Sequence, residues 1–269
     1  MPAASMTARD AVGAAVDALA AAGCETPRLD AEVLIADALG VGRGVLVSDP
    51  ALAVPPGAAR TIGERIRRRV AREPVAYILG SRGFRRIELA VDPRVLIPRP
   101  ETELLVEIAL ELPDGAAVHE VGTGSGAVAL ALLDERPDLR VTASDLSPDA
   151  VDVARANAER LGLALEPFVA DGLPPGDYDL VLANLPYVCD DEWASLAPEI
   201  TRYEPRLALT SGSDGLDAIR ALVAQAPSGL RLALEHGSEQ GPAVRELLDD
   251  AETRCDLAGH ERVTVGRAP

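Results

Sequence analysis

From Ala116 onward the chain alternates between short apolar runs and longer helical patterns, and this alternation restricts the possible folds more than any other feature. Strands that alternate with helices are typical of an α/β fold, a doubly wound and mostly parallel sheet. We therefore predict a Rossmann-like, seven-stranded sheet whose last two strands form a hairpin. The strands are expected near 116–121, 139–144, 164–169, 178–183, 229–235, 252–258 and 262–267, and the helices near 125–134, 148–162, 214–226 and 238–249.

Residues 1–75 carry helix signals instead and predict a small all-α domain. Thr7 and Asp10 have the spacing of a capping box, and Thr26 before Pro27 has the pattern of a helix start. Helices are expected at 8–22, 27–39, near 45 and at 56–70. The apolar side of the second helix is expected to comprise Leu29, Val33, Ile35, Ala36 and Leu39.

The last of these helices is crowded with arginines, namely Arg65, Arg67, Arg68, Arg69 and Arg72. A solvated face is the ordinary interpretation of such a charge run, and we favour it. The alternative is a docking patch for an acidic partner. The next segment, residues 76–100, is expected to link the domains through a hairpin at 82–91, leaving residues 101–269 as the α/β domain.

A glycine-rich segment, Gly122-Thr123-Gly124-Ser125-Gly126, follows the first predicted strand of the sheet and opens a helix. Glycines there permit a tight turn and a close approach of a ligand to the backbone. The GxGxG spacing differs from the GxGxxG of dinucleotide sites, and Glu120 precedes it. The motif suits S-adenosylmethionine, which has no pyrophosphate to be held.

Acidic residues also end the next two predicted strands. Asp145 ends the second, where a carboxylate can accept hydrogen bonds from both ribose hydroxyls of a nucleoside. Asp171-Gly172 ends the third, where a carboxylate and backbone N–H groups can meet the adenine edge. Each acid alone could be an ordinary turn or cap residue. Three of them at successive strand ends, beside the glycine loop, favour a cofactor site.

The tetrapeptide Asn184-Leu185-Pro186-Tyr187 follows the apolar run 178–183 and suits a planar, NH2-bearing acceptor. The Asn184 side-chain oxygen can accept one N–H and the Leu185 carbonyl the other, while Pro186 stiffens the turn and Tyr187 offers a face for stacking. By itself the tetrapeptide would be interpreted as an ordinary turn. Its position downstream of the glycine loop makes it the candidate catalytic element.

Composition narrows the function classes. The net charge of −17 argues against broad nucleic-acid binding, and we expect no direct nucleic-acid partner. The three cysteines are scattered without metal-ligand spacing, so no metal site is expected. No apolar run approaches the ~18 residues of a membrane span and no secretory signal is evident, so we expect a cytoplasmic protein without membrane contact.

The second half of the chain resembles class I S-adenosylmethionine-dependent methyltransferases, and the whole resembles the release-factor glutamine methyltransferases. The resemblance runs from about Pro27 to Arg267 and rests on the glycine loop, the tetrapeptide and four further segments: Glu73–Gly80, Ile97–Glu103, Leu234–Gly237 and Glu261–Arg267. The chain departs from the family pattern twice. Leu185 replaces the first proline of Asn-Pro-Pro-Tyr, and Glu120 replaces an aspartate.

The resemblance implies methyl transfer from S-adenosylmethionine to the side-chain amide of the glutamine in the Gly-Gly-Gln motif of peptide chain release factors, with S-adenosylhomocysteine as product. Residues 184–187 would be catalytic, Asn184 would also border the cofactor, and residues 1–75 would dock the release factor. Because Asn-Leu-Pro-Tyr also occurs in ribosomal RNA adenine dimethyltransferases, an adenine N6-methyltransferase acting on RNA or DNA is the alternative. Further alternatives are a glutamine methyltransferase of another translation protein and a non-catalytic scaffold.

Overall fold

The computed structural model describes residues 6–269, so residues 1–5 of the expected helical domain lie outside the described residues. The chain forms two compact units. The first contains the residues up to Gly80 together with residues 198–203, and the second contains residues 81–197 and 204–269. Residues 198–203 were not expected in the helical unit, because they are far from it in the sequence.

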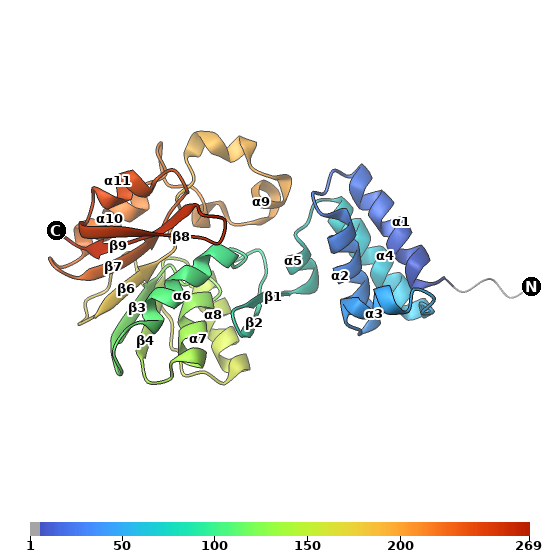
Figure 1. Cartoon of the computed structure of the whole chain (residues 1–269), viewed down its shortest axis with the longest axis horizontal. Helices are drawn as coiled ribbons and strands as arrows, with labels where there is room; N and C mark the ends of the chain where they lie inside the picture. The colour runs from blue at the N-terminus through green and yellow to red at the C-terminus, as the bar shows by residue number, and fades with distance from the viewer. Residues whose placement is uncertain (1–5) are drawn as a thin grey trace, which may run out of the picture. The chain divides into compact units, whose positions relative to one another are not determined.

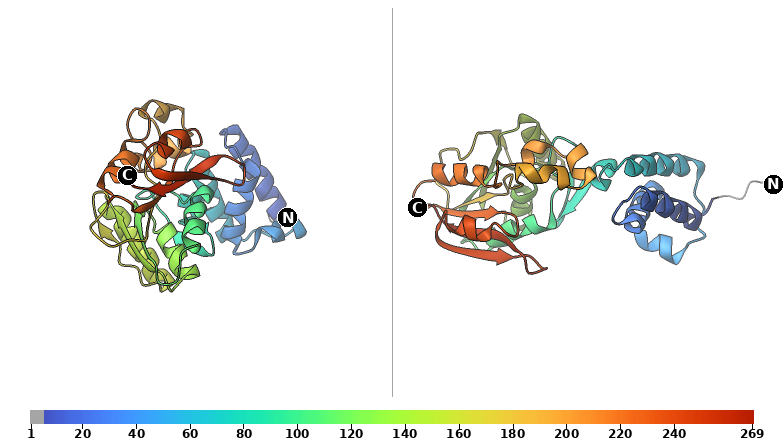
Figure 2. Two further views of the ribbon diagram at one scale, coloured as in Figure 1. Left: turned by 60° about the vertical axis from the view of Figure 1, so that its left-hand side comes forward. Right: turned by 90° about the horizontal axis from the view of Figure 1, so that it is seen from above.

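The first unit is all-α, as predicted, and its blue helices lie side by side in Figure 1 and in both views of Figure 2. It comprises α1 (Ala8–Ala21), α2 (Pro27–Leu39), α3 (Arg43–Ser48), α4 (Pro56–Val70), α5 (Val75–Leu79) and the added α9 (Pro198–Tyr203). The capping box of Thr7 and Asp10 is confirmed. Thr26 does precede α2, but its hydroxyl donates to the Asp30 carboxylate at 2.8 Å and does not cap the helix.

A buried ion-pair network links three segments of this unit. Arg69 Nε donates to Asp30 at 2.7 Å, and Arg69 Nη1 lies 2.8 Å from Glu199. Arg72 binds both oxygens of Glu199, at 2.7 and 2.6 Å. The prediction of a solvated face is therefore wrong for Arg69, because the buried Asp30 of α2 and the half-buried Glu199 of α9 pair with it. Arg67 on the same helix is exposed.

The face that α2 buries also differs from the prediction. Leu29 is 42% exposed, whereas Leu34 and Ile35 are fully buried. The ion pair with Arg69 holds Asp30 inside the unit, and the residue next to it then faces outward. The periodicity of apolar residues alone could not reveal this, because the pairing partner lies 39 residues away.

The second unit begins with the predicted hairpin, formed by antiparallel β1 (Ser81–Phe84) and β2 (Ile87–Ala90). A 3₁₀ turn, η1 (Pro100–Thr102), then leads into α6 (Glu103–Leu110). The large sheet has the order β5-β4-β3-β6-β7-β9-β8, and β9 runs antiparallel to the other six strands. Figure 1 labels all of these strands except β5. Its strands are β3 (Ala117–Val121), β4 (Arg140–Asp145), β5 (Phe168–Val169), β6 (Leu180–Ala183), β7 (Arg231–Glu235), β8 (Asp249–Cys255) and β9 (Glu261–Arg267).

The strand order confirms the predicted doubly wound fold. It reverses at β3, which pairs with β4 on one side and β6 on the other, and such a switch point opens a crevice at the carboxyl ends of the strands. The helices are α7 (Ala127–Glu135), α8 (Pro148–Leu161), α10 (Asp217–Gln225) and α11 (Gly241–Arg245), with short 3₁₀ turns η2 (Asp190–Ser195) and η3 (Arg206–Ala208). The helix at α11 is shorter than expected, because Asp249 already pairs with Arg267 of β9.

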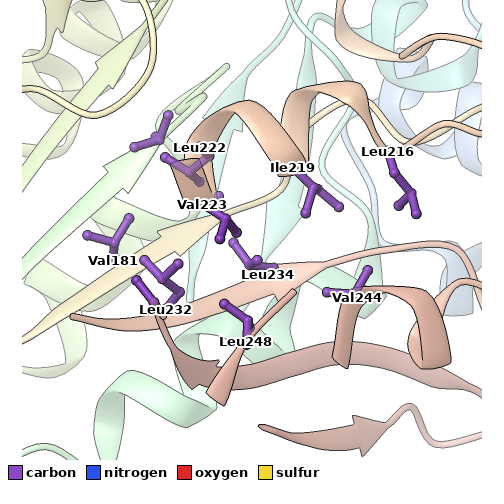
Figure 3. Packing of buried hydrophobic residues seen from close by; sticks show 12 residues of the cluster. Val181, Leu216, Ile219, Leu222, Val223, Leu232, Leu234, Val244 and Leu248 are labelled. Atoms are coloured by element: carbon purple, nitrogen blue, oxygen red, sulfur yellow. The ribbon is translucent and has the colours of Figure 1, made fainter. Parts of the chain in front are cut away.

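The core between α10 and the sheet fixes the far wall of this crevice. Ile219, Leu222 and Val223 of α10 pack on Val181 and Leu232 of the strands (Figure 3). Each is under a tenth exposed, so the helix is held against the sheet by close apolar packing. Within residues 6–269, no helix combines the length and the apolar character that crossing a membrane requires.

Candidate active site

The carboxyl ends of the central strands enclose one cavity of about 350 Å³ in the second unit. That volume is in the range of small-molecule sites, and the cavity lies at the switch point of the sheet. Most of the residues selected from the sequence line it, namely Glu120, Gly122, Thr123, Gly124, Ser125, Asp145, Asp171, Gly172, Asn184, Leu185 and Pro186. Gly126 and Tyr187 are outside the set of lining residues.

The glycine loop adopts backbone conformations that a residue with a side chain rarely takes. Gly122 has φ 77°, and a Cβ there would lie 3.1 Å from Leu185 Cδ2. Gly124 has φ 54°, and a Cβ there would meet no protein atom within 4 Å. Gly126 instead closes the loop onto α7, since its Cβ would lie 2.8 Å from Leu130. Gly122 therefore leaves room for the Leu185 side chain of the tetrapeptide, and Gly124 leaves space next to the backbone at the cavity surface.

Asp145 ties the end of β4 to the glycine loop. Its carboxylate accepts hydrogen bonds from Gly124 N at 2.8 Å and Ser147 N at 2.9 Å. Burial raises the pKa of Asp145, while these hydrogen bonds act to lower it. A carboxylate offers about four lone-pair positions, so the group retains acceptor capacity for hydroxyls of a ligand. Ribose binding by Asp145 stays a prediction that this geometry permits.

Glu120 is buried beneath the loop. Its Oε2 accepts hydrogen bonds from Thr123 Oγ1 at 2.6 Å and from Ala129 N at 3.0 Å. Burial raises its pKa to about 8, against the effect of those hydrogen bonds. The longer side chain that replaces the family aspartate thus joins the loop to α7. Direct contact with a cofactor stays a prediction.

The titration of Glu120 predicts how stability depends on pH. A carboxyl whose pKa is raised by folding stabilises the fold below its unfolded pKa, and this contribution is lost as pH rises through the folded pKa. For Glu120 that window runs from 4.5 to about 8. We expect Glu120→Gln to reduce the fall in the unfolding free energy of the ligand-free protein between about pH 6 and 8, as measured by urea denaturation.

Glu135→Gln is the matched control, because hydrogen bonds from Arg85 lower the pKa of Glu135 and place its titration below this window. Burial also raises the pKa of Glu235 to about 7, so the unfolding free energy of both variants should still fall somewhat as pH rises through this range. An equal fall in the native protein and in Glu120→Gln would contradict the assignment.

Gln225 of α10 closes the end of the cavity near Asp171 and Gly172. Its Oε1 accepts a hydrogen bond from Leu173 N at 2.9 Å, and a Cβ at Gly172 would lie 2.1 Å from that oxygen. Gln225 also lines the cavity. No sequence pattern pointed to Gln225, because a glutamine in an amphipathic helix is ordinary. The placement of Asp171 and Gly172 leaves their predicted contact with adenine open to test.

The tetrapeptide turns at the end of β6. Asn184 Nδ2 donates to Thr102 Oγ1 at 2.9 Å, and the Leu185 side chain packs against the core under α10. The leucine that replaces the family proline therefore gains apolar packing. Gln240 Nε2 donates to the Tyr187 carbonyl at 2.9 Å. Burial raises the pKa of the Tyr187 phenol to about 12, so it is neutral at physiological pH.

The segment before η1 is braced from within the second unit. Glu204 accepts a hydrogen bond from Ile97 N at 3.1 Å and pairs with Arg99 at 2.5 Å. This holds Pro98, Arg99 and Thr102 along the cavity wall. Residues 97–103 were singled out in the sequence, but Thr102 was not distinguished among them. Among residues 6–269, no cluster of three or more His, Cys, Asp or Glu side chains is placed to hold a metal ion.

The sheet order and the cavity at its switch point define a doubly wound α/β protein with a small-molecule site. Residues 118–203 match the family model "Methyltransferase domain". The hMettl16 catalytic domain, solved in complex with MAT2A 3′UTR hairpin 6, superimposes with a TM-score of 0.54 at 14% identity, over 66% of this chain and 74% of that one. At that identity the likeness shows the fold alone.

The particular family follows from matches that span the whole chain. Residues 10–80 match the "PrmC N-terminal domain" model. The release factor glutamine methyltransferase of Cereibacter sphaeroides is 43% identical over 98% of this chain and 99% of its own, and that of Burkholderia pseudomallei is 44% identical over 90% and 92%. The same enzyme of Moorella thermoacetica is 43% identical over 96% and 97%. The chain belongs to the release factor glutamine methyltransferase family.

Proposed function

We propose that this protein methylates the side-chain amide nitrogen of the glutamine in the Gly-Gly-Gln motif of peptide chain release factors, with S-adenosylmethionine as methyl donor. The observation that carries the proposal is the end-to-end match to relatives that bear this activity in their names. The cavity supports it, because the glycine loop and an NH2-accepting tetrapeptide line the same space. Such an activity belongs in the cytoplasm, where release factors work.

The residues of the cavity fit S-adenosylmethionine. Asp145 retains acceptor capacity for ribose hydroxyls, the bare surface at Gly124 admits a close ligand, and Gly172 with Gln225 forms the end where we place adenine. When bound, the cofactor supplies an electrophilic methyl group on a sulfonium. S-adenosylhomocysteine is then the product that must leave.

The protein's part in the reaction is to orient a poor nucleophile. The lone pair of an amide nitrogen is delocalised into its carbonyl, so approach and desolvation decide the rate. The Asn184 side-chain oxygen and the Leu185 carbonyl accept the two amide N–H bonds and fix the direction of the nitrogen. Tyr187 lies outside the residues that line the cavity, so its stacking on the amide stays a prediction. The amide proton is lost late, after the new C–N bond has begun to form.

Mass spectrometry of purified release factor, after incubation with enzyme and methyl-labelled S-adenosylmethionine, tests the proposal. We expect one added methyl group on the glutamine of the Gly-Gly-Gln peptide. Ribosomal RNA and genomic DNA serve as parallel acceptors. Labelled adenine together with unmodified release factor would replace the proposal with the adenine alternative, which the net charge of −17 disfavours.

The first prediction from this function concerns the cofactor. We expect Gly124→Ala to weaken S-adenosylmethionine binding by about tenfold or more, or ~1.4 kcal/mol, because the new methyl group projects from the cavity wall. Titration calorimetry measures the change. Gly162→Ala at the end of α8 is the matched control, since Gly162 also has a positive φ, 68°, and no protein atom would meet its Cβ. Equal affinity in both variants would remove Gly124 from the cofactor site.

The helical unit is our candidate for docking the release factor. Its support is the match of residues 10–80 to the N-terminal domain that accompanies this activity in the family. Deleting residues 1–75 would not test docking alone, because it would also remove Arg69 and Arg72, the ion-pair partners of Glu199 in α9. Cross-linking of the intact enzyme to release factor, followed by peptide mapping, is the suitable measurement. Contacts confined to the second unit, residues 81–197 and 204–269, would contradict the docking role.

A further inference from the structure

Two buried side chains from distant parts of the second unit, Thr102 and Glu235, lie in series behind Asn184. Thr102, at the end of η1, is 5% exposed, and Glu235, the last residue of β7, is 1% exposed. Asn184 Nδ2 donates to Thr102 Oγ1 at 2.9 Å, and hydrogen bonding by the Thr102 side chain acts to lower the pKa of the Glu235 carboxyl. The second carboxylate oxygen, Oε2, is buried and has no hydrogen-bond partner among residues 6–269.

The chemistry of these three groups sets the direction of the chain of hydrogen bonds. An ionised carboxylate can only accept, and a threonine hydroxyl has a single proton to donate. When Thr102 donates to Glu235, its oxygen must accept from its other neighbour. The NH2 end of the Asn184 amide therefore faces Thr102, and its oxygen is left for another donor.

We propose that Thr102 and Glu235 are positioning residues that hold the Asn184 side chain with its oxygen toward the acceptor NH2 group. The inference rests on the proposed function, since it explains how the acceptor amide is recognised. Without the pair, the Asn184 amide could turn by 180° and present its own NH2 group, which cannot accept an N–H. Neither residue touches the acceptor in this scheme, and both act through Asn184.

The surroundings of Glu235 make the arrangement sensitive to protonation. Burial raises its pKa to about 7, with Glu101 adding to the rise and Thr102, Arg262 and Arg99 opposing it. Its remaining ionisable neighbours are the Tyr187 phenol, which titrates far higher, and His236, whose pKa burial lowers. Protonated Glu235 can donate to Thr102, which frees the hydroxyl to donate to the Asn184 oxygen. The acceptor then loses its partner, so kcat should fall as pH drops through this range.

Steady-state kinetics of Thr102→Val and Thr102→Ser on release factor, at saturating S-adenosylmethionine, test the pair. We expect Thr102→Val, which keeps the shape without the hydroxyl, to lower kcat by about tenfold or more, equivalent to ~1.4 kcal/mol, while KM and cofactor affinity stay within about twofold. Thr102→Ser should restore most of the rate. Native kcat in the valine variant, or an equally slow serine variant, would overturn the proposal.

The pH profile separates positioning from simple packing. We expect native kcat to rise with pH around neutrality, and Glu235→Gln to be slower and to lack this step. A Glu235→Gln enzyme with the native profile would overturn the role of Glu235. Any NH2 acceptor needs the Asn184 oxygen, so the variants are compared on whichever acceptor the native enzyme labels. The identity of that acceptor tests the release-factor assignment, and the variants test the positioning role.

A readout independent of catalysis comes from the side-chain NH2 signals of Asn184 in the ligand-free, ¹⁵N-labelled enzyme. Asn184 and Asn157 are the only asparagines of the chain, which makes the signals assignable with Asn184→Ala as reference. We expect slowed hydrogen exchange of the Asn184 NH2 group that Thr102→Val abolishes. The Asn157 signal, from a residue bonded to Ser125 and Ala90, serves as the internal control. Identical exchange in both proteins would overturn the hydrogen bond on which the proposal depends.

Discussion

Replacement of Asn184 by alanine should slow methyl transfer to the release-factor glutamine by about ten- to hundredfold, because one amide N–H is left unpaired in a closed pocket at a cost of ~1–3 kcal/mol. The loss should fall on kcat, since the hydrogen bond fixes the nitrogen while the new bond forms. Single-turnover assays with saturating cofactor and release factor measure it directly.

Cofactor affinity and stability are the controls for this variant. Asn184 is half-buried at the cavity edge, and its side chain is hydrogen-bonded to Thr102, so we expect the dissociation constant of S-adenosylmethionine to change by less than about threefold, or ~0.7 kcal/mol. Full activity on release factor would refute the positioning mechanism while leaving the family unchanged. A large loss of cofactor affinity would instead indicate that Asn184 binds the cofactor and does not position the acceptor amide.

Much of the fold was predictable because its signals are local. The capping box at Thr7, the proline after Thr26 and the apolar runs of the strands each act within a few residues. The capping box and the proline are found as predicted, and each predicted strand overlaps an observed one, although β5 is reduced to Phe168–Val169. The predictions failed where a distant partner decides the outcome. Leu29 faces outward because Asp30 is held by Arg69, and residues 198–203 join the helical unit because Glu199 meets the same arginine.

The candidate site divides in the same way. The glycine loop, Asp145, Asp171 and the tetrapeptide could be found because strand ends in a parallel sheet gather at one edge, and they do line one cavity. Thr102, Glu235 and Gln225 could not, because each matters only through a neighbour far away in the sequence. The two buried histidines are hydrogen-bonded core residues, because His119 contacts Thr142 and Ser144 and His236 contacts Thr264.

The second large effect is expected in the helical unit. Arg69→Met should destabilise it by about 3–5 kcal/mol, because the change leaves the buried Asp30 carboxylate unpaired and removes one partner of Glu199. Although burial acts to raise it, hydrogen bonds from Arg72 and Arg69 hold the pKa of Glu199 at about 2, so this carboxylate is charged at any ordinary pH. Native-state amide hydrogen exchange of α1, α2 and α4 gives the local opening free energy without requiring the whole chain to unfold in two states.

Arg67→Met is the matched control, because Arg67 lies two residues away on α4, is exposed, and its guanidinium donates to the carbonyl of Gly63 on its own helix. We expect it to change the opening free energy by less than about 0.5 kcal/mol. A second test replaces both Asp30 and Arg69 by apolar residues of similar volume. This double variant should recover part of the stability that Arg69→Met loses, since an unpaired buried charge is costlier than an apolar pair. If Arg69→Met and Arg67→Met destabilise the unit equally, the ion pairs between α2, α4 and α9 do not hold residues 198–203 in it, and apolar packing must do so.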